Sequence, residues 1–234
     1  MFFPYAFDPT FILLIPAMAF AFWAQWKVKS TFEEYSRVRA SNGLTGRDMA
    51  RQIMMRNGVT GVEVEAVNGV LADHYDPRTR TVRLSSSNYS GDSISSIAVA
   101  AHEVGHVLQH QQGYVPLTLR SGMAPAVGFA STAAWPLFLI GLFVGVRVPF
   151  GGFLMDLGIV FFAGAVLFHL VTLPVEFDAS KRALAELTST GAVMPQEVAG
   201  AKKVLDAAAL TYVAAAAMAA LQLVRLVLLR NSRR

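Results

Sequence analysis

The run Ser96-Ile-Ala-Val-Ala-Ala-His-Glu-Val-Gly-His-Val-Leu108 is largely apolar, contains no proline, and carries two histidines and one glutamate. Residues four apart lie on one face of an α-helix, so His102 and His106 can direct both imidazoles at one divalent ion. Glu103 lies at the side of that face, where it can take a proton from a water that the ion activates and later protonate a leaving amine. The pattern His-Glu-x-x-His therefore predicts a Zn²⁺ site with Glu103 as general base and acid.

The amino-acid composition limits the ligands that such a metal can have. The chain contains no cysteine, which excludes disulfides, thiolate metal sites and cysteine nucleophiles. A metal must then be held by carboxylates and by some of the five histidines. The alternative interpretation is a chance match, with both histidines hydrogen-bonded inside an ordinary helix. The apolar flanks of the motif favour the metal site.

Local patterns predict a small α+β segment before and around the motif. Thr45 and Asp48 resemble a capping box that opens an amphipathic helix, and Gly58 ends this helix. Asp92 or Ser93 can cap the helix of the motif. That second helix is expected over Ile94 to about Gln112. Three strands are expected at Val62–Val67, Val70–Tyr75 and Thr81–Leu84.

The remaining chain has the composition of a membrane protein. Of its 234 residues 54% are hydrophobic and only 15% are charged, which is unusual for a soluble domain. A net charge of +4, with no basic run interleaved with aromatic residues, gives no indication of nucleic-acid binding. Four apolar stretches are long enough to cross a bilayer. They lie at residues 1–26, Ala124–Val146, Phe153–Leu173 and Ala207–Leu229.

The distribution of basic residues predicts an orientation in the membrane. Eleven Lys and Arg residues lie within Lys27–Arg120 and four within Pro174–Asp206. Two spans separate these polar segments, so both are expected on the same side, and the positive-inside rule places that side in the cytoplasm. Arg230, Arg233 and Arg234 oppose this orientation if the last apolar stretch also spans.

Three motifs carry a resemblance to a known family. Leu71-Ala-Asp-His-Tyr-Asp-Pro77, Ser93-Ile94, and Ala98-Val-Ala-Ala-His-Glu-Val-Gly-His106 with Gln109-His110 resemble the YugP-like bacterial membrane zinc metallopeptidases over nearly the whole chain. More distantly, the order of motif helix, transmembrane hairpin and following Glu is similar to the HtpX-type membrane proteases. In those enzymes the third zinc ligand is the first Glu of an E-x-x-x-D motif.

The resemblance implies a third ligand in Pro174-Val-Glu-Phe-Asp-Ala-Ser180. It places Glu176 in the ligand position, while Ser180 stands where the wider group carries Asp. Asp178 is the alternative, either as a supporting residue or as a competing ligand. Pro174 is expected to end the third span and begin a new helix. Capping that helix is the alternative role for Glu176.

For other polar residues the sequence gives weaker indications of a functional role. His110 forms a second i, i+4 pair with His106, but this pair lacks the following Glu. His110 is therefore interpreted either as a polar neighbour of the site or as a polar residue near the membrane surface. His169 lies inside the third span, where it either lines a cleft or is hydrogen-bonded within the helix bundle. Tyr75, Tyr89 and His110 are the candidate oxyanion donors, and Thr81–Leu84, extended by Ser85–Tyr89, is the candidate edge strand for substrate.

The predicted fold class is a mainly α-helical membrane protein with about four transmembrane helices and a small α+β zincin-like catalytic subdomain. The expected divisions are an N-terminal transmembrane anchor (1–26), the zincin-like subdomain (27–120), a transmembrane hairpin (121–173), a helix with the third zinc ligand (174–206) and a C-terminal transmembrane or membrane-associated helix (207–234).

The predicted function is that of a zinc metalloendopeptidase embedded in the bacterial cytoplasmic membrane, with its active site facing the cytoplasm. One Zn²⁺ per chain is held by His102, His106 and Glu176, and Glu103 is the general base. The expected partners are the lipid bilayer and a peptide or membrane-protein substrate, including misfolded proteins; the sequence leaves the oligomeric state open. The alternatives are a catalytically silent zinc-binding membrane scaffold and a small transporter or channel in which His169 lines the path.

Overall fold

A computed structural model describes residues 9–70, 72–145, 148–189 and 193–232. The chain forms two compact units. Unit 1 comprises 1–23, 119–172 and 212–234, and unit 2 comprises 24–118 and 173–211. Helices α1, α5, α6 and α7 each contribute residues to both units.

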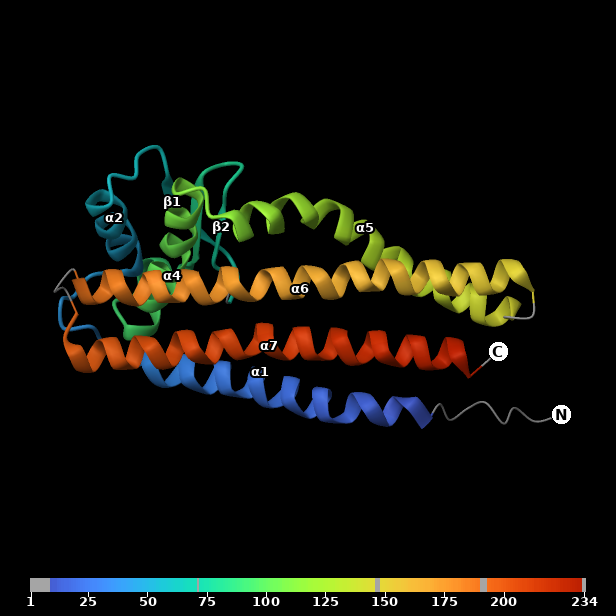
Figure 1. The fold of residues 1–234 in the computed structure, drawn as a ribbon. Helices are drawn as coiled ribbons and strands as arrows, with labels where there is room; N and C mark the ends of the chain where they lie inside the picture. Colours follow the sequence, from blue (N-terminus) through green and yellow to red (C-terminus); the bar gives the residue numbers. More distant parts are fainter. Residues whose placement is uncertain (1–8, 71, 146–147, 190–192, 233–234) are drawn as a thin grey trace. The chain divides into compact units, whose positions relative to one another are not determined.

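The structure is mainly helical, with one small sheet (Figure 1). The helices are η1 (Pro9–Leu14), α1 (Ile15–Ser36), α2 (Gly46–Arg56), α3 (Ser86–Ser90), α4 (Ile94–Gln111), α5 (Val115–Val144), α6 (Pro149–Ser189) and α7 (Pro195–Asn231). The strands are β1 (Glu63–Val67), β2 (His74–Asp76) and β3 (Thr81–Ser85). Four helical segments are long and apolar enough to cross a bilayer: η1 with α1, α5, α6 and α7. The described residues therefore confirm the mainly helical part of the predicted fold class, with four long apolar helices and one small sheet.

The two helices predicted from capping residues form as expected in unit 2. Helix α2 begins after Thr45, whose hydroxyl accepts the backbone N–H of Asp48 while the Asp48 carboxylate accepts that of Thr45. Helix α4 begins after Ser93, whose hydroxyl accepts the backbone N–H of Ser96. These bonds satisfy backbone donors that have no partner inside the first turn of a helix.

The sheet differs from the prediction in its strand order, β1-β3-β2, with β1 parallel and β2 antiparallel to β3. β3 is therefore the central strand, and the expectation that Thr81–Leu84 is an edge strand is wrong. The expected extension over Ser85–Tyr89 holds only for Ser85, the last residue of β3. From residue 86 the chain turns into α3, and Asp73 accepts hydrogen bonds from Ser85 and Asn88 at this turn. The strand expected at Val70–Tyr75 begins only at His74, and residue 71 lies outside the described residues.

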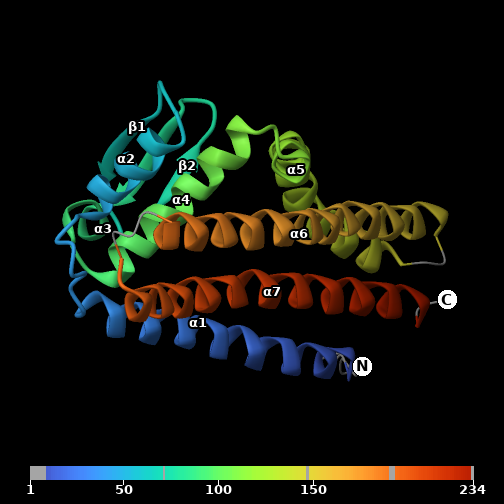
Figure 2. The same cartoon turned by 60° about the vertical axis from the view of Figure 1, so that its left-hand side comes forward.

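Unit 2 has one apolar core around α4. Helix α2 contributes Met49 and Ile53, the sheet contributes Val82 and Leu84, and α4 contributes Val104 among many others. Figure 2 shows α2 and α4 beside the strands. Burying each large apolar side chain contributes about 1.5–3 kcal/mol, so α4 is the best anchored helix of the unit.

Helices α4 and α6 touch at Gly105. A Cβ atom at position 105 would lie 2.5 Å from the backbone oxygen of Ala179, closer than atoms can pack. Only glycine permits this backbone approach. Gly105 is the second variable residue of the His-Glu-x-x-His pattern, so the motif itself contains the contact that brings α6 against it.

Helix α6 continues through Pro174 without ending. The expectation that Pro174 ends one helix and begins another is therefore wrong, and Glu176 lies inside a helix rather than at its cap. A proline inside a helix costs about 3 kcal/mol. Buried apolar residues after it, including Val175, Ala179 and Leu187, offset this cost by packing in unit 2.

In unit 1, α5, α6 and α7 pack through Phe138, Met155 and Leu226, which are almost fully buried. Arg230 of α7 donates from Nε and Nη2 to the two carboxylate oxygens of Asp156 in α6, at 2.9 and 3.0 Å. Arg230 is one of the three arginines that oppose the predicted orientation if the last apolar stretch spans. Arg233 and Arg234 lie outside the described residues.

The close approach of α4 and α6 leads to a first prediction. Replacing Gly105 by alanine should force the helices apart and destabilise the protein by about 1–3 kcal/mol, measurable as a lower Tm in detergent. The matched control is Gly164→Ala, because a Cβ at this helical glycine meets no atom within 4 Å. An unchanged Tm for Gly105→Ala would contradict the packing described for these helices.

Candidate metal centre

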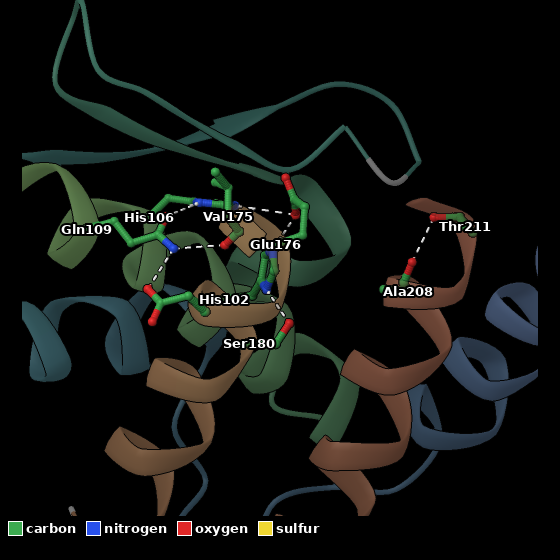
Figure 3. Close-up of polar contacts among 9 residues, drawn as sticks. His102, His106, Gln109, Val175, Glu176, Ser180, Ala208 and Thr211 are labelled. Atoms are coloured by element: carbon green, nitrogen blue, oxygen red, sulfur yellow. Dashed lines mark hydrogen bonds and ion pairs between the residues drawn. The ribbon is translucent and has the colours of Figure 1, made fainter. Parts of the chain in front are cut away.

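Three predicted ligands lie together in unit 2. His102 and His106 come from α4 and Glu176 from α6, and one ligand atom from each lies within 4.8 Å of the other two. The Glu176 Oε2 atom is 3.2 Å from Nε2 of His102 and 3.6 Å from Nε2 of His106. Figure 3 shows these side chains turned toward one another. Residues that are 74 and 70 positions apart in the chain therefore converge on one point.

The donor set and its burial fit a zinc ion. Glu176 is 2% exposed and His106 8% exposed, and a buried carboxylate is costly unless it is paired or binds a metal. In the described part of the chain the group has three members. Two imidazoles and one carboxylate, with a further coordination position left for a small molecule, are typical of catalytic zinc sites.

The electrostatics of the group favour a cation between its members. Burial lowers the pKa of His106, but hydrogen bonding to Glu176 and the charges of Glu103 and Glu176 act in the opposite direction and raise it above its usual value. The carboxylates thus stabilise positive charge at the Nε2 side of His106. A proton or a divalent metal ion can provide that charge.

A hydrogen bond at Nδ1 orients each imidazole. Ser180 Oγ lies 3.1 Å from Nδ1 of His102, and Gln109 Oε1 lies 3.0 Å from Nδ1 of His106 (Figure 3). When Nδ1–H donates to these oxygens, Nε2 keeps its lone pair for a metal. Ser180 stands where the wider group carries Asp, and its hydroxyl provides an acceptor for His102.

Gln109 is the residue that sequence reasoning missed. Its side chain is completely buried, and its amide Nε2 donates to Val175 O at 2.8 Å and to Asp178 Oδ2 at 2.9 Å. In the sequence, Gln109 appeared only in the Gln109-His110 pair that contributes to the family resemblance, with no role of its own. Its position three residues after His106, on the same helix face, was the available signal.

Asp178 takes part in this network and is not a member of the three-residue group. Its Oδ2 atom also accepts from Arg182 Nε at 2.5 Å, and Arg182 Nη1 donates to Gln112 Oε1. The carboxylate is thus held between an amide and a guanidinium. It supports Gln109, which in turn orients His106.

Glu103 is buried next to the three-residue group. Burial raises the pKa of its carboxyl above the usual value, the charges of His102 and His106 act against this rise, and Glu176 and Asp73 add to it. A carboxylate with a raised pKa is a better proton acceptor than an exposed one. Its position one residue after His102 follows from the helix, as the motif predicts.

The other candidate residues lie in different surroundings. His110 is exposed, and its Nδ1 is 2.8 Å from the Tyr75 hydroxyl. Tyr89 lies beneath the guanidinium of Arg47, which is 5.5 Å from the ring centre. His169 belongs to unit 1, where its ring lies beside that of Phe168.

The fold and the site together define a class: a helical protein with long apolar helices that could cross a membrane, and a group of two histidines and one glutamate that could hold a metal ion, built on the helix of a His-Glu-x-x-His motif. The chain belongs to the family described as "Putative neutral zinc metallopeptidase", whose model matches residues 10–231. It is 52% identical over 217 residues to "Putative membrane protease YugP" of Bacillus subtilis (strain 168), a match that covers 93% of this chain and 94% of that protein. No solved structure matches the chain. The predicted resemblance to the YugP-like family is confirmed.

The buried network leads to a second prediction. Gln109→Leu should remove the acceptor for His106 and weaken zinc binding by about 10–100-fold, measured by competition with a zinc-binding dye. Gln111→Leu is the control, because this exposed residue of α4 has no place in the network. Equal zinc affinity in the two variants would contradict the role of Gln109.

Exchanging the amide and the carboxylate between positions 109 and 178 tests the same hydrogen bond more directly. In Gln109→Glu two carboxylates would face each other at positions 109 and 178, so zinc binding should fall. Adding Asp178→Asn provides an amide that donates to the new carboxylate and should restore much of the affinity. A double variant no better than Gln109→Glu would show that the hydrogen bonds do not act as described.

Proposed function

We propose that this protein is a zinc metalloendopeptidase of the bacterial cytoplasmic membrane that cleaves membrane-associated or misfolded proteins. Its family is one of zinc metallopeptidases, and its curated relative is named as a membrane protease. The observation that carries the proposal is the convergence of two histidines and Glu176, with Glu103 buried beside them.

One zinc ion per chain is proposed to be held by His102, His106 and Glu176. When bound, the ion supplies Lewis-acid chemistry: it polarises a substrate carbonyl and lowers the pKa of water to about 7. Among the described residues three protein ligands converge rather than four, which favours catalysis over a purely structural site. This number of ligands argues against the silent scaffold.

The chain's own residues supply the proton transfers. Glu103 accepts a proton from the attacking water as the C–O bond forms, and its raised pKa makes it a competent base. It then delivers that proton to the amine that leaves as the C–N bond breaks. Ser180 and Gln109 hold the two imidazoles in orientation throughout.

The substrate is proposed to bind along β2. In the described residues β2 pairs with β3 alone, so its other edge has no strand partner and offers backbone groups to an extended peptide, and β2 packs against α4. The bond between the Tyr75 hydroxyl and His110 ties this strand to the motif helix. This arrangement supports a zincin-like subdomain, with β2 taking the role that the sequence had assigned to β3.

The site is proposed to face the cytoplasm. The two segments that make up most of unit 2 carry most of the basic residues of the chain, which the positive-inside rule places on the cytoplasmic side.

The proposed mechanism is tested by Glu103→Gln in purified, zinc-loaded protein. Peptide cleavage should fall by at least about 10²–10⁴-fold, because the amide cannot accept the proton, while about one zinc per chain stays bound. The control is Glu33→Gln, an exposed residue whose side chain lies 4.0 Å from Lys29. Cleavage is followed with a quenched fluorescent peptide and zinc by elemental analysis.

The outcomes distinguish the alternatives. Equal cleavage by Glu103→Gln and the wild type would eliminate the mechanism. Zinc binding with no cleavage by the wild type would favour the scaffold. A transport activity that survives Glu103→Gln would favour the transporter.

The third ligand is tested by comparing Glu176→Gln with Asp178→Asn. Glu176→Gln should weaken zinc binding more, because the carboxylate charge is lost at the convergence point, whereas Asp178 acts only through Gln109. Zinc affinity is measured by dye competition at constant pH. The reverse order of affinities would move the third ligand to position 178.

A further inference from the structure

Unit 2 contains a pocket of about 280 Å³ that the metal centre does not use. It is lined by the loop after α2, the turn between β2 and β3, and the C-terminal part of α4. Val59, Val62 and Val107 form its apolar lining. The volume is at the small end of the range for ligand pockets, which suits a single side chain or chain terminus rather than a large ligand.

The polar lining of the pocket suits a negatively charged group. Arg80 is its charged residue, Tyr75 and His110 contribute a hydroxyl and an imidazole, and no acidic residue lines it in the described part of the chain. Arg80 Nη2 donates to the backbone oxygen of Thr60 at 3.3 Å, which anchors the guanidinium at the pocket. A carboxylate on a short apolar stem matches both parts of this lining.

The backbone also holds Arg80 in place. Its φ angle is +53°, the only positive value among the described non-glycine residues, and its carbonyl accepts the backbone N–H of Glu63 at 3.1 Å. The turn is therefore tied to the start of β1. An arginine fixed at both its backbone and its side chain loses little conformational freedom when it binds a partner.

The position of the pocket along α4 relates it to the reaction. Val107 and His110 follow Glu103 by four and seven residues and lie on the same helix face. At about 1.5 Å per residue, they lie roughly 6 and 10 Å further along the helix. A peptide that runs along α4 in extended form advances about 3.3 Å per residue, and a group in the pocket then belongs to a substrate residue about two or three positions from the scissile bond.

We propose that this pocket binds a carboxylate of the peptide substrate, with Arg80 as its counter-charge. The carboxylate is either a Glu side chain two or three positions from the scissile bond or the free C-terminus of a short product-side segment. The assignment rests on the proposed peptidase function, because the position is measured from Glu103.

The test compares quenched peptides that differ in a single carboxylate. Glu is replaced by Gln at each position near the cleaved bond, with the C-terminus either free or amidated, and kcat/KM is measured. The wild type should prefer one carboxylate by about fivefold, the effect of one partly exposed ion pair. Loss of the preference on amidation identifies the terminus, and loss on Glu-to-Gln replacement identifies the side chain.

The role of Arg80 is tested by reversing or removing its charge. Arg80→Glu should abolish the preference and favour a Lys peptide instead, and Arg80→Gln should abolish it without reversal. Neither change adds a Cβ atom at the positive φ angle, since arginine already has one. The matched control is Arg78→Glu in the same turn, which is not among the lining residues and should keep the wild-type preference.

The outcomes separate this proposal from the peptidase function. Cleavage that is equal for all peptides, or a preference that survives Arg80→Glu, overturns the pocket assignment and leaves the peptidase function standing. If the zinc-loaded wild type cleaves nothing, the peptidase function fails. In that case the pocket assignment is tested by the binding of the same labelled peptides, measured by fluorescence anisotropy. Weaker binding by Arg80→Glu than by Arg78→Glu supports the pocket assignment, and equal binding overturns it.

Discussion

Helix α4 touches helix α6 at Gly105, where the backbones come too close for any side chain to intervene. Glu176 lies one turn before Ala179, the residue of α6 that makes this contact, so the same approach brings its carboxylate to the two histidines of α4. The carboxylate is only 2% exposed, and a charge buried to this degree without its partners would cost several kcal/mol. The packing of α4 against α6 and the position of Glu176 beside the histidines therefore depend on the same contact.

A buried network of hydrogen bonds then fixes the orientation of the two imidazoles. Each histidine has an acceptor at Nδ1, and Gln109 uses both ends of its amide, accepting from His106 and donating to Val175 and Asp178. Such networks orient side chains well only when every member has a partner, because an unpaired polar group in a low dielectric is costly. Arg182 provides the last partner by binding Asp178 near the protein surface.

The failed predictions share one cause. Pro174 and Ser85–Tyr89 were interpreted from local patterns, yet α6 continues through the proline because residues beyond it pack in the core of unit 2. The central position of β3 depends on β1, which pairs with it in parallel from the other side of the β2–β3 hairpin. Strand order and helix continuity are set by contacts between segments far apart in the chain, and a local pattern does not contain them.

By itself, the sequence determined whatever depends on near neighbours in the chain. The i, i+4 spacing of His102 and His106, the helix caps and the apolar stretches follow from helix geometry and hydropathy, and these were predicted without the fold. The resemblance supplied Glu176 from its motif. Only the tertiary structure decided that this carboxylate reaches the histidines, that Gln109 supports one of them, and that Arg80 lines a pocket beside α4. The physical reason is that hydrogen bonds and pockets depend on distances between folded segments, which packing sets and chain spacing does not.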